Sequence, residues 1–201
     1  KAKQITIRDQ AILTDLARCR VLSFEQLKNA YWPKAKERTC RERLERLEKA
    51  GYLARAVAPP GERPGNALEA YYLRAKGRRA TGAPRLFLTP GNAEEVAHQV
   101  RANQVYFELT EEEKATWTVG ELLEAKGRQA PDARFVSQDG EVVYVEADTG
   151  HYKRHQVLEK LAAWGGTRQV WVCLAGRREG FLRSCGVKEV RTYTLPRKEA
   201  V

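Results

Sequence analysis

Four arginines lie close together in one short segment of the sequence, between residues 37 and 50. Cys40, Leu44 and Leu47 recur there at helical spacing, which predicts a helix that buries one stripe and ends at Gly51. The opposite side of this helix is expected to expose Arg38, Thr39, Arg41, Arg43 and Arg46. Arginine neutralises phosphates, and Arg and Thr side chains also hydrogen-bond to base edges. We therefore predict that this helix binds double-stranded DNA, the simpler alternative being a solvated helix whose arginines pair with its own glutamates.

Three carboxylates in the C-terminal half of the chain form a second candidate site. Asp132 precedes one predicted strand, and Glu146 and Asp148 end another. Three carboxylates near the end of a sheet could supply the oxygen ligands that Mg²⁺ or Mn²⁺ prefers. The alternative is a solvated strand end whose acids pair with Arg154.

The elements around the basic helix predict a helical bundle followed by a hairpin. Residues 8–18 have apolar side chains at helical spacing, and Ser23 with Gln26 three residues later forms a predicted capping box for a second helix. After the basic helix, two extended runs at 52–57 and 68–73 flank a Pro- and Gly-rich turn, which predicts a β-hairpin. Three helices and a hairpin are the layout of a winged helix-turn-helix domain, whose third helix reads the major groove.

The distribution of charge supports this interpretation. Residues 1–84 contain 19 Lys and Arg against nine Asp and Glu, and so carry the whole net charge of +10. Residues 85–201 contain 17 of each sign. A generically basic surface would show no such asymmetry, so we predict a DNA-binding domain at 1–84 and a second domain at 85–201. Arg63 on the expected wing, with Arg78 and Arg79 beyond the hairpin, extends the basic surface.

The second domain has the pattern of an α/β fold. Residues 133–136 and 142–148 are predicted strands joined by a turn that contains Asp139-Gly140. A helix at 153–164 and an apolar strand at 169–174 follow. The strand-helix-strand order indicates a β-α-β unit, so the whole chain is predicted to be α+β.

Composition excludes several other classes of protein. The four cysteines form no CxxC pair, which favours reduced thiols in a cytoplasmic protein over a disulfide framework or a zinc site. No apolar run approaches the roughly 18–20 residues that cross a bilayer, so no membrane partner is expected.

The second domain also resembles a known family. The order Pro131-Asp132, strand, turn, strand and Glu146-x-Asp148 resembles the PD-(D/E)XK nuclease-like fold. In that family the two acids bind a divalent metal and a lysine supports the attacking water. By position Asp132 and Glu146 match the acids, but Asp148 stands where the family has lysine. Lys153 or Lys160, on the following helix, could replace it.

The chain as a whole resembles the replication-relaxation family of plasmid and mobile-element proteins, over roughly residues 8–175. The pieces that carry the resemblance are the winged helix, His98–Leu109, Pro131-Asp132-Ala133 and Val145–Gly150 before a helix with Lys160, Leu161 and Trp164.

This resemblance implies a DNA-binding protein of a plasmid or other mobile element. It would act as an accessory replication or mobilisation factor or as a transcriptional regulator. One alternative is an Mg²⁺- or Mn²⁺-dependent endonuclease with Asp132, Glu146, Asp148 and Lys160 as catalytic residues; another is a protein adaptor that binds no DNA. Because position 148 lacks lysine, we expect little or no cleavage and a second domain that serves assembly, either as a homodimer or with replication or mobilisation proteins.

Overall fold

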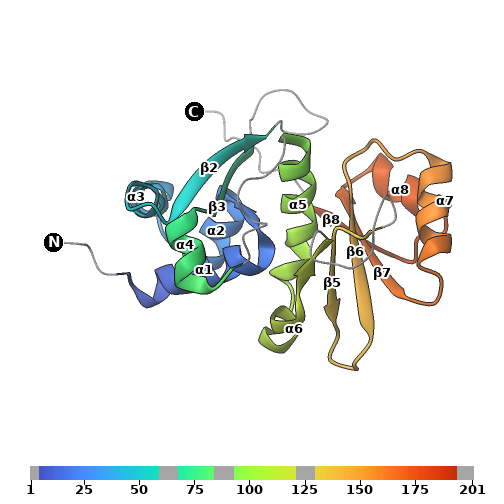
Figure 1. Ribbon diagram of the computed structural model, residues 1–201. Helices are drawn as coiled ribbons and strands as arrows, with labels where there is room; N and C mark the ends of the chain where they lie inside the picture. Colours follow the sequence, from blue (N-terminus) through green and yellow to red (C-terminus); the bar gives the residue numbers. More distant parts are fainter. Residues whose placement is uncertain (1–4, 59–67, 84–92, 121–129, 194–201) are drawn as a thin grey trace. The chain divides into compact units, whose positions relative to one another are not determined.

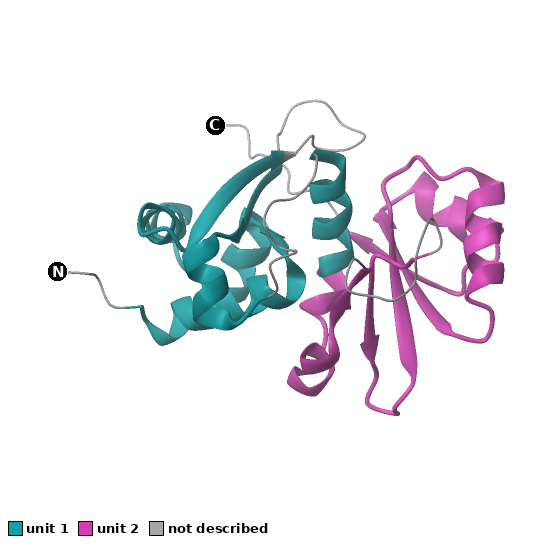
Figure 2. Cartoon of the chain, in the orientation of Figure 1, with its two compact units in different colours: residues 1–103 teal, residues 104–201 magenta. Residues whose placement is uncertain are grey.

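The computed structural model describes residues 5–58, 68–83, 93–120 and 130–193. The chain divides into two compact units, residues 1–103 and 104–201 (Figure 2). Helices accompany two separate sheets, so the predicted α+β class is confirmed (Figure 1). Within the described ranges, no helix combines the length and the apolar character needed to cross a membrane.

The first unit is built around a three-stranded antiparallel sheet in the order β1-β3-β2. Its elements in chain order are α1 (Ile7–Cys19), β1 (Val21–Ser23), α2 (Phe24–Tyr31), α3 (Glu37–Lys49), β2 (Leu53–Ala58), β3 (Leu68–Leu73), α4 (Ala75–Thr81) and α5 (Ala93–Tyr106). Strands β2 and β3 pair from Leu53↔Leu73 to Ala58↔Leu68, which is the pairing of the predicted hairpin.

Local side-chain chemistry explains where these helices begin and end. Ser23 and Gln26 form the predicted capping box at the start of α2, with a Gln26 N to Ser23 Oγ distance of 3.1 Å. Thr6 and Asp9 cap α1 in the same way. Gly51 follows α3 with a φ of +80°, a left-handed conformation that glycine adopts without strain.

Helix α5 completes the first unit. Its residues Val96, Ala97 and Val100 pack against Val21 of β1 and Ala70 of β3 in one buried cluster. Packing of this kind supplies the apolar burial that a three-stranded sheet lacks by itself.

Buried amide side chains attach the same helix to its neighbours. The Gln26 side chain donates to the carbonyl of Val100 at 2.7 Å. The Asn103 amide donates to the carbonyls of Cys19 and Val21, at 2.9 and 2.7 Å. Through these contacts the compact first unit extends to Asn103, beyond the division after residue 84 that the sequence suggests.

The second unit contains a five-stranded sheet in the order β4-β5-β6-β7-β8. Strands β4, β5 and β6 pair antiparallel, whereas β6, β7 and β8 pair parallel, as the predicted β-α-β unit requires. Its further elements are α6 (Glu111–Thr116), β4 (Thr118–Val119), β5 (Ala133–Val136), β6 (Val142–Asp148), α7 (Arg154–Ala163), β7 (Arg168–Leu174), α8 (Arg177–Ser184) and β8 (Glu189–Tyr193).

The core of this unit is aromatic. Trp164 and Trp171 lie at its centre with a ring-centroid distance of 6.3 Å, and Leu182 of α8 joins their buried cluster. A separate stack pairs Trp117 with Phe135. Burial of four consecutive residues of β7, Val170–Cys173, agrees with the apolar run that predicts a strand covered on both faces.

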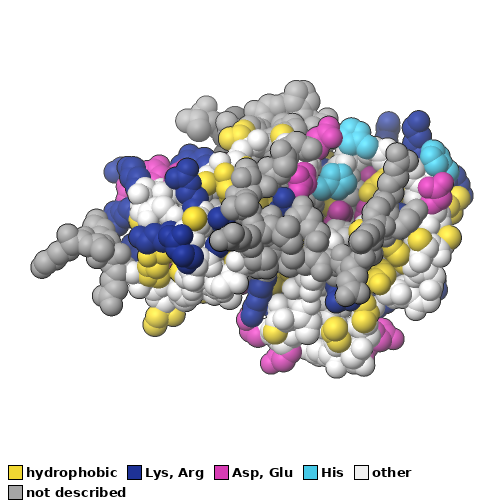
Figure 3. All heavy atoms as spheres, viewed as in Figure 1, with side chains coloured by type: hydrophobic (Ala, Val, Ile, Leu, Met, Phe, Trp, Pro, Cys, Tyr) yellow, Lys and Arg dark blue, Asp and Glu magenta, His cyan; other side chains and the backbone are white. Residues whose placement is uncertain are grey.

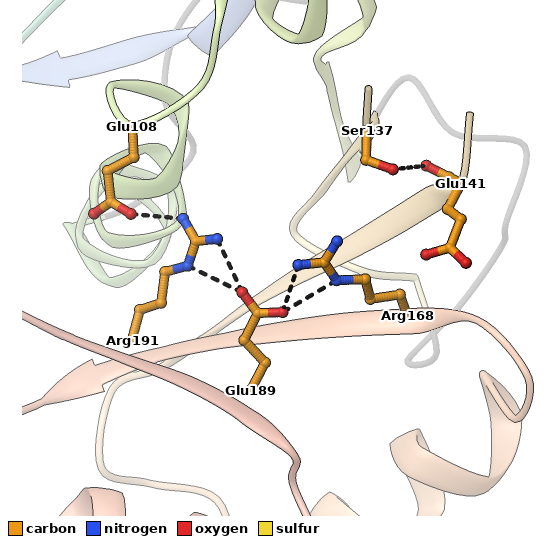
Figure 4. A network of polar contacts seen from close by, with 6 residues as sticks. All are labelled: Glu108, Ser137, Glu141, Arg168, Glu189 and Arg191. Atoms are coloured by element: carbon orange, nitrogen blue, oxygen red, sulfur yellow. Dashed lines mark hydrogen bonds and ion pairs between the residues drawn. The ribbon is translucent and has the colours of Figure 1, made fainter. Parts of the chain in front are cut away.

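Charged side chains fix the edge strand β8 (Figure 4). Glu189 accepts hydrogen bonds from Arg168 of β7 at 3.0 and 3.1 Å and from Arg191 at 2.9 and 3.3 Å. Arg191 also reaches Glu108 at 2.6 Å. This network joins two neighbouring strands to the segment that follows α5.

The cysteines form no disulfide in the structure. All four are buried thiols, in agreement with the prediction from their spacing. Burial raises the pKa of Cys40 and that of Cys173 to about 11, which keeps both thiols protonated and weakly reactive at neutral pH.

Candidate nucleic-acid interface and carboxylate site

Helix α3 buries the predicted stripe and exposes a charged face. Cys40, Leu44 and Leu47 are buried, with at most 4% exposure. Thr39 is exposed, and Arg38 at the start of the helix has a side chain that is 88% exposed. Lysine and arginine side chains also gather over α3 and α4 on the face of the molecule seen in Figure 3.

Two of the predicted DNA-binding arginines hold the fold together. Arg43 donates two hydrogen bonds to Asp9, one of them at 2.8 Å, and Asp9 is completely buried. Burial alone would raise the pKa of Asp9, but hydrogen bonds from Arg43 and Thr6 bring it below its ordinary value. The carboxylate is therefore ionised, and Arg43 faces α1 instead of pointing outward as the sequence predicts.

Arg41 is similarly engaged. Its guanidinium bonds to Glu37 at 2.7 Å and to Glu69 of β3, and it lies 3.9 Å above the Phe24 ring. Burial alone would lower the pKa of Arg41, but the bonds to the two carboxylates raise it. Leaving these partners for a DNA base would cost three interactions, so Arg41 is better suited to fixing α3 on the sheet than to reading bases.

The other arginines of the helix remain available at the surface. Arg38 Nε lies 2.8 Å from Glu42 Oε1, and Arg46 Nη2 lies 3.9 Å from Glu42 Oε2. The Arg46 side chain is 52% exposed. Exposed pairs one helical turn apart are weak and are screened by salt, so these guanidinium groups can exchange a carboxylate for a phosphate.

The remaining predicted contacts lie past the hairpin. Arg79 is exposed on α4, whereas Arg78 is half-buried and donates to the carbonyl of Leu73 at 3.0 Å. Lys76 is exposed beside them and lies 4.3 Å above the Tyr52 ring. Arg63 lies outside the described residues.

In the second unit the structure brings Glu146 and Lys160 together. Lys160 reaches back from α7 and places its Nζ 2.6 Å from Glu146 Oε1, and both residues are buried. Tyr152 donates its hydroxyl to the same carboxylate oxygen. The Asp132 carboxylate accepts from the backbone N–H of Ala147 at 2.7 Å, next to Glu146 in the chain. Lys160, named by the sequence as a replacement lysine, thus contacts the acid, while Lys153 is exposed at the N-cap of α7.

The electrostatics of Glu146 are unusual for a carboxylate. Burial raises its pKa to about 8, and the negative charge of Asp132 adds to the increase, although Lys160 and Tyr152 oppose it. Among the described residues, its Oε2 atom is buried without a hydrogen-bond partner. A perturbed carboxylate with a partner lysine is a common feature of functional sites.

Asp148 does not join this group. Its carboxylate accepts two hydrogen bonds from Arg178 of α8, at 2.5 and 3.0 Å, and a third from the backbone N–H of Gly150 at 2.8 Å. The proposed set of three metal-binding carboxylates therefore does not converge. Over the part of the chain that is described, no three His, Cys, Asp or Glu side chains are placed to hold a metal ion.

Sequence reasoning missed two residues of this region, Tyr152 and Arg178. The Arg178 guanidinium also donates to the carbonyl of Tyr152 at 2.7 Å, so it connects Asp148 to the segment that leads into α7. Tyr152 lies six residues after Glu146, and an aromatic hydroxyl so close to a predicted site acid was the available signal. Arg178 is thirty positions from its acid and gave no such signal.

The comparisons with known proteins point to one family. A family model with the description replication-relaxation matches residues 13–167. The match spans α3 and also includes Asp132, Glu146 and Lys160. No curated protein and no solved structure matches the chain significantly.

Proposed function

The chain belongs to the replication-relaxation family, and from that membership we propose that it is a DNA-binding protein of a plasmid or other mobile element. Family membership indicates a role in replication or in mobile-element function. We propose more narrowly that the protein is an accessory replication or mobilisation factor or a transcriptional regulator, and that double-stranded DNA is its ligand.

The order of elements in the first unit supports this proposal, and we interpret it as a winged helix-turn-helix domain. Helices α1, α2 and α3 are followed by the β2-β3 hairpin, and the short strand β1 pairs with β3 at Val21↔Tyr72. In domains of this kind the third helix enters the major groove and the hairpin contacts the neighbouring backbone. In this chain α3 would be the reading helix.

The observation that carries the proposal is the exposure of two arginines on α3, in the unit that holds the chain's excess positive charge. Arg38 and Arg46 are exposed there and are held only by weak pairs with Glu42. Residues 1–84 contribute the net charge of +10, so the field around this part of the chain attracts a polyanion. Neutralised phosphates release counterions, which supplies affinity.

A salt titration of DNA binding tests the proposal. Fluorescence anisotropy with a labelled duplex should give an affinity that falls steeply as salt rises, by orders of magnitude if several phosphates are neutralised. Combined Arg38→Ala and Arg46→Ala substitution should weaken binding and lower the salt slope by about 2. Arg134→Ala with Arg177→Ala removes two exposed charges from the second unit and should change little. A flat salt dependence, or equal effects of the two pairs, would contradict the proposal.

A second candidate function, a metal-dependent endonuclease, is favoured by the contact of Lys160 with Glu146. We propose that Asp132 and the unpartnered oxygen of Glu146 would hold Mg²⁺ or Mn²⁺, whose carboxylate preference fits these donors. Such an ion polarises a phosphoryl oxygen and activates water. Lys160 would supply the positive charge that position 148 lacks.

Plasmid cleavage separates the two functions. Without enzymatic activity, supercoiled DNA should remain intact with Mg²⁺ or Mn²⁺, and the second unit would serve for dimerisation or for binding replication or mobilisation proteins. Nicking that disappears in Glu146→Gln and Lys160→Met, but persists in Lys153→Met, would establish the endonuclease. The Lys153 control removes an exposed lysine from the start of the same helix.

A further inference from the structure

A single carboxylate lies between two arginines on the outward side of α3. Glu42 is 47% exposed, and its two oxygens face different guanidinium groups, Oε1 toward Arg38 and Oε2 toward Arg46. Its neighbours on the helix therefore orient the carboxylate from both sides. The hydrogen bond and the charge of Arg38 also lower the pKa of Glu42, so it is ionised and acts only as an acceptor.

A carboxylate at this place is unfavourable for simple phosphate binding. Duplex DNA presents one negative charge about every 1.7 Å along its axis, so an ionised Glu on the contacting face is repelled by the backbone. The flanking arginines offset part of that repulsion. A donor on a base edge would offset the rest, because the carboxylate would then exchange one hydrogen-bond donor for another.

Adenine N6 and cytosine N4 are both donors in the major groove, but the N7 acceptor beside adenine N6 repels a carboxylate. The cytosine amine therefore suits a carboxylate better. We infer that Glu42 is a specificity-determining residue that accepts a hydrogen bond from cytosine N4 in the DNA target, an inference that rests on the proposed function of α3.

The other charged residues of α3 do not fit this role. Arg41 and Arg43 are engaged by Glu69 and Asp9. Glu37, at the start of the helix, is bound by Arg41, which the sheet holds in place. Glu48 pairs with Arg55. Glu45 is exposed, but it lies in the C-terminal half of the helix, whereas reading helices of this type contact bases mainly through their N-terminal residues. Glu42→Gln and Glu45→Gln thus form a matched pair, since each removes one exposed charge from the same helix.

Selection from a pool of duplexes with a randomised centre tests the inference, using the full chain. The wild-type protein should enrich cytosine at one position of its site. Glu42→Gln should reduce that preference by roughly fivefold or more and shift it toward adenine, whose N6 and N7 atoms suit an amide. Glu45→Gln should retain the cytosine preference.

Other results would contradict either the inference about Glu42 or the proposed DNA-binding function. If Glu42→Gln tightens binding to all duplexes and leaves the base preference unchanged, Glu42 only repels phosphates and the inference fails. Loss of the preference in Glu45→Gln instead, or enrichment without any cytosine preference, also overturns it while the DNA-binding function stands. Failure of the wild-type protein to enrich any duplex overturns both. Because Glu42 and Glu45 are exposed, circular dichroism should show both variants folded.

Discussion

Replacement of Arg43 by alanine should destabilise the first unit, although Arg43 lies on the helix that we propose reads DNA. The substitution removes two charge-assisted hydrogen bonds from Asp9, a carboxylate with no exposed surface. Loss of every partner of such a buried charge costs about 3–5 kcal/mol. Asp9 keeps hydrogen bonds from Thr6 N at 2.7 Å and Thr6 Oγ1 at 2.8 Å, so the expected loss of unfolding free energy is smaller, about 2–3 kcal/mol.

Thermal unfolding followed by circular dichroism measures this loss. For a unit of this size, the expected decrease in Tm is roughly 10–20 °C at neutral pH. The pKa of Asp9 is lowered in the folded chain, so the ion pair contributes its full stability above the ordinary Asp9 pKa of 3.8. This stability is lost as the pH falls through the folded value. The difference between wild type and Arg43→Ala should therefore shrink below pH 3.8.

Arg38→Ala is the matched control, because it removes an exposed arginine from the same helix. Its Tm should equal that of the wild type, while its affinity for DNA should fall. If Arg43→Ala melts at the wild-type temperature, the buried pair with Asp9 does not support the fold and our assignment of Arg43 as a structural residue is wrong.

Three further predictions concern the buried thiols, a buried ion pair and two helical glycines. The four buried thiols should resist a disulfide reagent at neutral pH and react only after unfolding in guanidinium; stoichiometric labelling of the native chain would contradict their burial. Arg178→Ala leaves a buried carboxylate with fewer partners and should lower unfolding free energy by about 2–3 kcal/mol, whereas exposed Arg177→Ala should not, as urea titrations can establish. In Gly77→Ala the added Cβ would lie 2.4 Å from the backbone oxygen of Tyr52, so this variant should have a lower Tm than the wild type. In Gly180→Ala the added Cβ meets no atom within 4 Å, so the Tm should rise slightly. A higher Tm for Gly77→Ala than for Gly180→Ala would refute this account.

Local sequence signals predicted much of the fold, because they act over a few residues. The capping box of Ser23 and Gln26 and the left-handed Gly51 are set by neighbours in the chain, and both occur in the structure. The apolar run at 170–173 likewise predicted a strand with two covered faces. The compact unit that ends at Asn103 was less accessible, since it depends on amide contacts with residues more than eighty positions away.

The contacts at the candidate sites depend on residues far apart in the sequence, and the spacing of residues does not reveal such partners. The helical spacing in α3 distinguishes the buried residues from those on the opposite side of the helix. It does not predict that Asp9 of α1 accepts hydrogen bonds from Arg43. The acidic end of β6 was recognised as a group, yet its two acids have different partners, Lys160 for Glu146 and Arg178 for Asp148. Lys160 was identified as a replacement lysine because a long side chain from the next helix can reach a strand end.

Helix α5 has a consequence for how such proteins exchange parts during evolution. Recombination that joined residues 1–84 to a foreign partner would leave behind Val96, Val100 and Asn103. The transferred piece would expose the apolar surface of β1 around Val21 and lose the hydrogen bonds that Asn103 donates to the carbonyls of Cys19 and Val21. We therefore expect a transferable version of the first unit to include α5, and natural fusions to have their junctions after this helix.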